Sequence, residues 1–267
     1  VNLANGANLL GDLTLSSGSL GIAPGDQATV SGILDVLGGN IQGGGTLRNA
    51  GLTRFANSGN VVINATTFDN TGTVDFAPIG GVFLAQNAEV RNSAGRFEFS
   101  GARGLDPSTG SGTFTNAGGE LLKTGGATVT MNVPFVSTGG DVRVAGGGFT
   151  AATFTENRGN IVLEPGAQLT PSTNFVNAAG ATIQGAGDLN IGNSLTNHGI
   201  LSANGQFNVT GVDVINSTSG VINGTGTLVA NSVQNSGTLA PGDSVGTLTI
   251  DGDLVMTGSS RLLIETQ

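Results

Sequence analysis

A short motif recurs along the chain at a nearly constant interval. It consists of an apolar residue, any residue, an asparagine, a short polar spacer and a glycine. Clear copies occupy residues 68–72, 195–199 and 233–237, and looser copies occupy 90–95, 114–118, 175–180 and 214–220. From position 70 the asparagine position recurs at 92, 116, 137, 157, 177, 197, 216 and 235, in steps of 22, 24, 21, 20, 20, 20, 19 and 19. A fixed period of this length indicates a repeat protein.

The segments between the motifs have the sequence character of short strands and turns. Residues 160–163 and 226–229 are β-rich runs, bounded by glycine, asparagine and proline. No helical periodicity is sustained anywhere in the chain. A coil built only from strands and turns cannot bury its own apolar side, so successive coils must stack.

We therefore predict an all-β fold: a right-handed parallel β-helix, or β-solenoid, with about 20 residues per coil and a single domain over residues 1–267. The handedness follows because parallel crossover connections are right-handed in about 98% of cases.

Stacking predicts columns of equivalent residues inside the solenoid. The apolar residue two positions before each asparagine should point inward, which gives the column Phe55, Phe68, Val90, Phe114, Phe135, Phe175, Leu195, Val214 and Val233. Each asparagine is predicted to lie at a turn, where its side-chain amide can bond to the same amide of the next coil. The following glycine is expected to adopt a positive φ. Two motif copies at Asn49 and Asn57 compete, so the register of residues 1–70 stays open.

Composition excludes several classes of partner. The net charge is −9 with only one lysine, whereas a nucleic-acid surface needs clustered Lys and Arg. There is no cysteine, which excludes disulfides and thiol metal sites. No apolar run reaches the roughly 18 residues needed to span a bilayer.

One serine and one histidine are candidate catalytic residues. Ser244, in the segment from Gly242 to Gly246, has the spacing of a nucleophile elbow. That motif requires a strand-to-helix turn and a histidine base in reach. No helix is expected, and the only histidine, His198, lies in the spacer of an ordinary motif copy. Both residues are therefore interpreted as structural turn residues.

Acidic residues supply the remaining candidates. Asp243, Asp251 and Asp253 could offer carboxylate oxygens to calcium, but no Gly-Gly-x-Gly-x-Asp series accompanies them. They are interpreted as solvated turn residues.

A β-helix polysaccharide lyase or glycosidase needs convergent carboxylates or a carboxylate–arginine cluster. The nearest approaches are the pairs Asp141/Arg143 and Glu156/Arg158, which we interpret as surface ion pairs. Residues 99–113 break the repeat, and the loop near Arg103 is predicted to leave the body of the solenoid as a possible ligand site. We expect no catalytic, cofactor-binding or metal-binding residue and no enzyme activity.

The last segment carries a family resemblance. Residues 238–265 contain Pro-Gly-Asp-Ser-Val-Gly-Thr-Leu, then Gly-Asp-Leu, then an apolar strand that ends in a glutamate. This segment resembles the autotransporter-associated β-strand repeat of bacterial passenger proteins. The resemblance implies a right-handed parallel β-helix on a large secreted or surface-displayed protein. The chain begins at Val1 without methionine and ends within strand-like sequence, so we expect it to be a segment of a longer protein.

These observations together predict a non-enzymatic structural or adhesive module of a bacterial extracellular or cell-surface protein, such as a stalk, fibre or matrix component. The expected partners are the chain itself, stacked end to end, or neighbouring coils of a parent chain, together with cell-surface or matrix polymers. No nucleic-acid partner, cofactor or membrane span is expected. Two alternatives remain open: a carbohydrate-active β-helix and a ligand-binding passenger.

Overall fold

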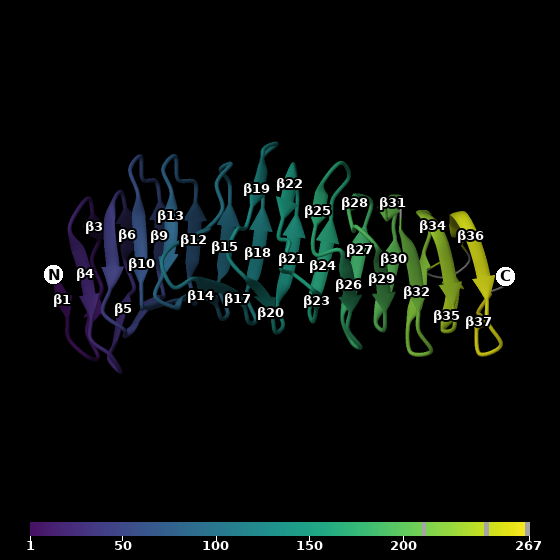
Figure 1. Ribbon diagram of the computed structural model, residues 1–267, viewed down its shortest axis with the longest axis horizontal. Coiled ribbons are helices and arrows are strands. Elements are labelled where there is room, and N and C mark those ends of the chain that lie inside the picture. Colours follow the sequence, from purple (N-terminus) through teal and green to yellow (C-terminus); the bar gives the residue numbers. More distant parts are fainter. Residues whose placement is uncertain (210–211, 243–245, 265–267) are drawn as a thin grey trace. The chain divides into compact units, whose positions relative to one another are not determined.

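The computed structural model describes residues 1–209, 212–242 and 246–264, and this part of the chain contains strands and turns but no helix. The chain divides into two compact units, Val1–Gly140 (unit 1) and Asp141–Gln267 (unit 2). Each unit is a stack of coils with parallel strand pairing (Figure 1). Together they contain about 12 turns of roughly 21 residues, which confirms the predicted β-solenoid. Its right-handedness and its single-domain organisation stay predictions.

Each coil of unit 1 has three short strands, which pair with the equivalent strands of neighbouring coils in three faces. Face 1A contains β1 (Asn2–Leu3), β4 (Ser19–Ile22), β7 (Gly39–Gln42), β10 (Val61–Asn64), β13 (Val82–Ala85) and β16 (Asp106–Pro107). Face 1B contains β2 (Asn8–Leu9), β5 (Gln27–Val30), β8 (Thr46–Asn49), β11 (Thr67–Asn70), β14 (Ala88–Asn92), β17 (Gly112–Asn116) and β20 (Phe135–Ser137). Face 1C contains β3 (Leu13–Leu15), β6 (Ile33–Val36), β9 (Leu52–Phe55), β12 (Thr73–Phe76), β15 (Arg96–Phe99) and β18 (Glu120–Lys123). A further strand of this unit is β19 (Thr128–Thr130).

Unit 2 repeats the three-strand coil. Face 2A contains β22 (Gly148–Thr150), β25 (Gln168–Thr170), β28 (Asp188–Leu189) and β31 (Gln206–Val209). Face 2B contains β23 (Glu156–Asn157), β26 (Asn174–Asn177), β29 (Ser194–Asn197) and β32 (Asp213–Asn216). Face 2C contains β21 (Asp141–Val144), β24 (Asn160–Leu163), β27 (Thr182–Gly185), β30 (Ile200–Ala203), β33 (Val221–Gly224), β35 (Thr238–Pro241) and β37 (Arg261–Leu262). Two longer strands, β34 (Thr227–Asn235) and β36 (Thr249–Met256), contribute to both 2A and 2B.

The predicted inward columns are largely confirmed. In face 1B, Phe68, Val90, Phe114 and Phe135 are consecutive register partners, and all four are buried. In face 2B the consecutive partners are Phe175, Leu195, Val214 and Val233, which are also buried. The apolar residue of the motif therefore fills the interior, as strand alternation requires.

The placement of Phe55 in this column was wrong. Phe55 is buried, but it lies in face 1C between Val36 and Phe76. The motif position of that coil belongs to Asn49, the register partner of Asn70 and 21 residues before it. Asn49 and Asn57 are each followed by a glycine two residues later. Only pairing with the next coil distinguishes them.

The motif asparagines form hydrogen-bonded ladders, as predicted. In unit 1 each Nδ2 donates to the Oδ1 of the next asparagine: Asn49 to Asn70 (2.7 Å), Asn70 to Asn92 (2.8 Å) and Asn92 to Asn116 (3.0 Å). In unit 2 the Nδ2-to-Oδ1 bonds of the ladder run through Asn157, Asn177, Asn197, Asn216 and Asn235, over 2.6–2.9 Å. All of these side chains are fully buried. Most of these amides also donate to a backbone carbonyl of the following coil, such as Asn177 to Ile200 (2.9 Å).

The expected role of the motif glycine needs correction at most positions. Gly72 and Gly199 do not have positive φ, although Gly180 does, at 80°. At Gly72 an added Cβ would overlap the carbonyl oxygen of Gly51 in the coil beneath, and at Gly199 it would overlap that of Ala181. Glycine is thus required there because two coils approach closely at the corner.

Candidate functional site

The segment that includes Arg103 does not leave the solenoid as predicted. Leu105 is fully buried, and β16, which follows it, pairs with β13 in face 1A. Asn132 Nδ2 donates to Asp106 Oδ1 at 2.6 Å. Arg103 itself is exposed, but the residues just after it belong to a coil. The predicted ligand loop is therefore part of the stack, because Leu105 supplies an inward apolar contact.

Face 1B carries a polar groove of about 410 Å³ on its outer side. Its lining comes from four consecutive strands and the turn after β14: Gln27, Thr46, Thr67, Asp69, Glu89, Arg91 and Ser93. These side chains converge because equivalent positions of parallel strands lie one above another, roughly 4.8 Å apart. The groove is the best candidate for a binding site in unit 1.

Two rows of outward side chains build the groove. Strand pairing places Gln27, Thr46, Thr67 and Glu89 in one row. The second row contains Arg48, Asp69 and Arg91. Between the rows the inward residues of the same strands fill the core, since neighbouring side chains of a strand point to opposite faces.

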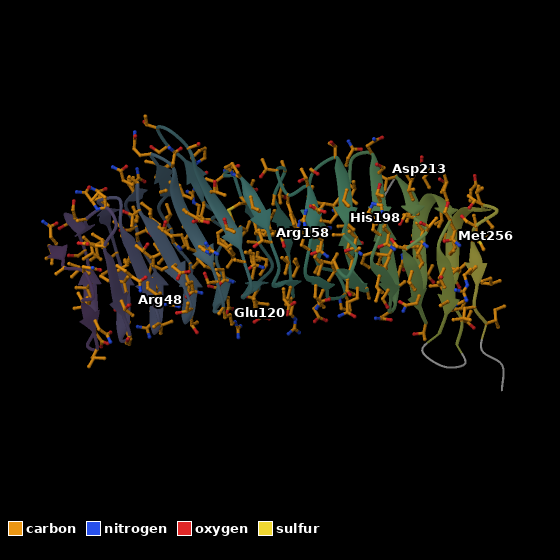
Figure 2. All side chains as sticks on the ribbon, turned by 90° about the horizontal axis from the view of Figure 1, so that it is seen from below. Arg48, Glu120, Arg158, His198, Asp213 and Met256 are labelled. Carbon is orange, nitrogen blue, oxygen red and sulfur yellow. The ribbon has the colours of Figure 1, made fainter. Side chains whose placement is uncertain are left out.

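Asp69 is the most constrained group of the groove. Its side chain is 17% exposed, and Arg48 Nε lies 3.8 Å from Asp69 Oδ2. Ser93 Oγ donates a hydrogen bond to Asp69 Oδ1. Arg48, labelled in Figure 2, also donates to Thr71 Oγ1 at 3.4 Å. A half-exposed ion pair contributes about 0–1 kcal/mol to stability, so these contacts position the carboxylate more than they stabilise the fold.

The charges of the groove balance. Arg91 in the lining and Arg48, which lies beside the groove and 3.8 Å from Asp69, together offset Asp69 and Glu89. Hydroxyl and amide groups supply the rest of the polar surface. Sequence analysis missed this cluster because positions 48, 69 and 89 are far apart in the chain. The coil period was the available signal, since adding about 21 residues to position 48 reaches 69 and then the vicinity of 91.

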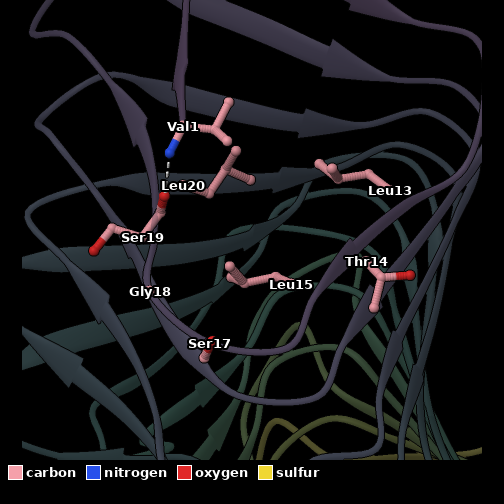
Figure 3. A pocket seen from close by; sticks show the side chains of 8 residues that line it. All are labelled: Val1, Leu13, Thr14, Leu15, Ser17, Gly18, Ser19 and Leu20. Carbon is pink, nitrogen blue, oxygen red and sulfur yellow. Dashed lines mark hydrogen bonds between the residues drawn. The ribbon is translucent and has the colours of Figure 1, made fainter.

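A second hollow lies at the first coil of unit 1. It has a volume of about 230 Å³, and Val1, Leu13, Leu15 and Leu20 contribute apolar side chains to it (Figure 3). The amino group of Val1 donates to the carbonyl oxygen of Ser19 at 2.7 Å. The other side chains of its described lining are apolar or carry a hydroxyl, so this hollow is an opening onto the apolar interior.

The residues singled out in the sequence do not form a catalytic cluster with one another. Within the described residues, no three carboxylate, imidazole or thiol side chains come together as a metal-ligand set. His198 Nδ1 lies 2.8 Å from Ser217 Oγ of the next coil (Figure 2). Asp251 and Asp253 are exposed on β36. Asp243 and Ser244 lie outside the described residues.

The two carboxylate–arginine pairs have different outcomes. Arg158 pairs with Glu156 at 2.7 Å on the outside of face 2B, as the sequence predicted. Arg143 pairs with Glu164 of the next coil at 2.7 Å, a partner that the sequence did not suggest, and its pairing with Asp141 stays a prediction. Pairing between coils competes with pairing along one strand because adjacent strands are closer than alternate residues of one strand.

Lys123 is a buried charged residue that sequence analysis did not identify. It stands in face 1C beside Phe99 and is fully buried. Its Nζ donates to the carbonyl oxygens of Thr124 and Gly125. Burial lowers the pKa of this amine below its ordinary value of 10.5.

A scan against models of protein families, a search of curated proteins and a search of solved structures each found no match. No helix in the described residues is long and apolar enough to cross a membrane.

Proposed function

We propose that this chain is a non-enzymatic structural or adhesive module of a bacterial extracellular or surface-displayed protein, serving as part of a stalk, fibre or matrix. The observation that carries the proposal is the pair of asparagine ladders. Each amide bonds to the same amide one coil further on, at 2.6–3.0 Å. The same hydrogen bond repeats between each coil and the next, so it extends the solenoid along its axis and does not assemble one local reaction centre.

The last coil supports a role in which coils are added. Leu254, Met256 and Leu262 continue the columns of Val233, Asn235 and Leu239. They are nevertheless 42%, 40% and 54% exposed, whereas those column partners are buried. An open strand edge with apolar side chains readily accepts another strand. The proposed partner is therefore a further coil, supplied by a neighbouring segment of a parent chain or by a second copy stacked end to end.

Turnover assays test the non-enzymatic part of this proposal. Purified protein is incubated with pectin and other polysaccharides, and the release of reducing ends and of unsaturated products is measured. We expect no release. Turnover that disappears in Asp69→Asn, Asp141→Asn or Glu156→Gln would contradict the proposal and favour a carbohydrate-active enzyme.

The adhesive part is tested by display on latex beads. Beads that carry the chain should aggregate or adhere to bacterial surfaces more than beads that carry an unrelated acidic protein of equal size. Equal behaviour of the two bead types counts against an adhesive role.

A further inference from the structure

The side chains that line the groove of face 1B belong to neither the apolar core nor the asparagine ladder, although Asp69 contacts Arg48 and Ser93 of the neighbouring coils. The lining residues all point outward, while the inward residues of the same strands, including Phe68 and Asn70, make the core and the ladder. Thr46, Thr67 and Asp69 are half-buried rather than free on the surface.

Charge and polarity restrict what the groove can take. An anionic ligand would meet Asp69 and Glu89, and a cationic ligand would meet Arg48 and Arg91. Because the two signs balance, a ligand without net charge incurs no uncompensated repulsion. An apolar ligand would desolvate these groups without replacing their hydrogen bonds, which is unfavourable.

The backbone of the groove excludes a peptide that adds as a strand. β8 pairs with β5 and β11, and β11 pairs with β8 and β14, so both edges of these strands are already bonded. Recognition by strand addition needs an unpaired edge. What remains available is a floor of hydroxyl, carboxylate, guanidinium and amide groups.

We propose that this groove binds a neutral oligosaccharide, extended across strands β5, β8, β11 and β14. Sugar hydroxyls both donate and accept, which matches the mixture of Thr67, Asp69, Glu89 and Arg91. A hydroxyl that donates to a fixed carboxylate, or that accepts from a guanidinium, makes a charge-assisted hydrogen bond, which is stronger than a neutral one. The strand step of roughly 4.8 Å is comparable with the length of one pyranose ring, so successive sugars can meet equivalent groups.

The lining contains no aromatic ring on which a sugar could stack. Affinity must therefore come from hydrogen bonds alone, and we expect dissociation constants of roughly a millimolar. A surface-displayed protein in many copies can turn such weak sites into firm attachment through multivalency. The binding of the oligosaccharide goes beyond the structural role proposed above and does not depend on it; only the multivalent attachment rests on that role.

Binding is tested with the purified chain and three neutral probes: cellohexaose, maltohexaose and mannohexaose. Saturation-transfer NMR detects contact and calorimetry measures affinity, both up to millimolar concentrations. We expect at least one probe to bind and hexagalacturonate, its anionic counterpart, to bind at least several-fold more weakly. Tighter binding of hexagalacturonate, or no binding of any neutral probe, would overturn the proposal.

Matched variants locate the site. Thr67→Val keeps the side-chain shape and removes one hydroxyl of the groove, and Glu89→Gln removes one charge. Each should weaken binding about fivefold to tenfold, the loss expected for one hydrogen bond. Thr73→Val, on the exposed outer side of face 1C in the same unit, should leave affinity unchanged. Thermal unfolding confirms that the variants are folded, and equal affinity of the wild type and both groove variants would refute the assignment of the site.

Discussion

At the scale of the residue, the asparagine ladder shows how a buried polar group is made compatible with an apolar interior. Asn197 accepts from Asn177 and donates to Asn216, to Gly199 and to Val221. Burial of an amide with all its hydrogen bonds made lowers the stability little, whereas burial of an amide without a partner lowers the unfolding free energy by about 1–3 kcal/mol. Asn49 illustrates the exception: its Oδ1 has no partner because its register neighbour in the coil beneath is Val30.

The ladder predicts a strong effect of Asn197→Asp. The substitution keeps the shape but removes the Nδ2 donor and places a carboxylate against the oxygen of Asn216. We expect a loss of about 3–5 kcal/mol in unfolding free energy at neutral pH, as for other unpaired buried charges. Denaturant unfolding measures the loss.

The destabilisation should shrink as the pH falls from neutral towards about 4, because burial raises the pKa of the new carboxyl above its ordinary value, and protonation then removes the charge and restores a donor. Asn204→Asp, at an exposed turn position, is the matched control and should change stability by less than about 0.5 kcal/mol. A loss at position 197 that is equal at acidic and neutral pH would contradict the ladder as its cause.

Lys123 predicts that the stability of the wild type increases with pH, whereas that of Asn197→Asp increases as the pH falls. The folded-state pKa of Lys123 is lowered by burial from the ordinary 10.5, so the unfolded chain binds the proton more tightly. Stability therefore rises as the pH increases from the folded-state pKa to 10.5, and the charged amine is a cost below that window. The chain has no tyrosine, no cysteine and no other lysine. Lys123 is thus the side chain whose titration should govern stability on the alkaline side, below pH 10.5.

Replacement of Lys123 by methionine, which retains an apolar stem of similar length, should abolish this alkaline rise. Urea unfolding at intervals between neutral pH and pH 11 is the measurement. A slope that persists unchanged in Lys123→Met would show that Lys123 is not its cause.

At the scale of the element, each strand is too short to be stable alone and depends on its two neighbours. β26 has four residues, of which Phe175 and Asn177 are buried. The ring of Phe175 meets that of Phe154 edge to face, with centroids 4.9 Å apart. One strand thus contributes an apolar side chain to the core and an amide to the asparagine ladder. The outward residue between them has no place in either.

Truncation of Phe175 to alanine should cost about 3–5 kcal/mol, through lost burial and the cavity that remains. Val176→Ala, on the outer side of the same strand, should cost about 1 kcal/mol or less. Thermal and denaturant unfolding of the two variants provide the comparison. An unchanged melting temperature in Phe175→Ala would mean that the interior column does not stabilise unit 2.

At the scale of the whole molecule, stability is a sum of contacts between nearest coils. Within the described residues, the coil of β36 and β37 has a neighbour on one side only. The half-exposed Leu254, Met256 and Leu262 are the local result in unit 2. In a head-to-tail contact each added copy presents the same face again, so association does not close. The proposed assemblies should therefore grow with protein concentration, without a fixed maximum number of copies.

Light scattering should therefore show an average mass that increases with protein concentration. Leu262→Lys places a charge in the open column and should reduce association strongly. The position is 54% exposed, so the folded chain should tolerate the change. A wild type that stays strictly monomeric at high concentration would rule out stacking between copies.

The sequence by itself determined the solenoid, its period, the inward apolar column and the amide ladder. Those features repeat, and a repeat reports which positions share one environment without any knowledge of distant contacts. The sequence also predicted the Glu156–Arg158 pair, because the two residues are only two positions apart within a single coil.

Only the tertiary structure decided the features that depend on which coil lies above which. It selected Asn49 over Asn57 through pairing with Asn70, and it placed Phe55 in another face. It also brought Arg48, Asp69 and Glu89 together from three coils. The physical reason is that strand register is fixed by the packing of neighbouring coils, and a change of one position turns every side chain to the opposite face.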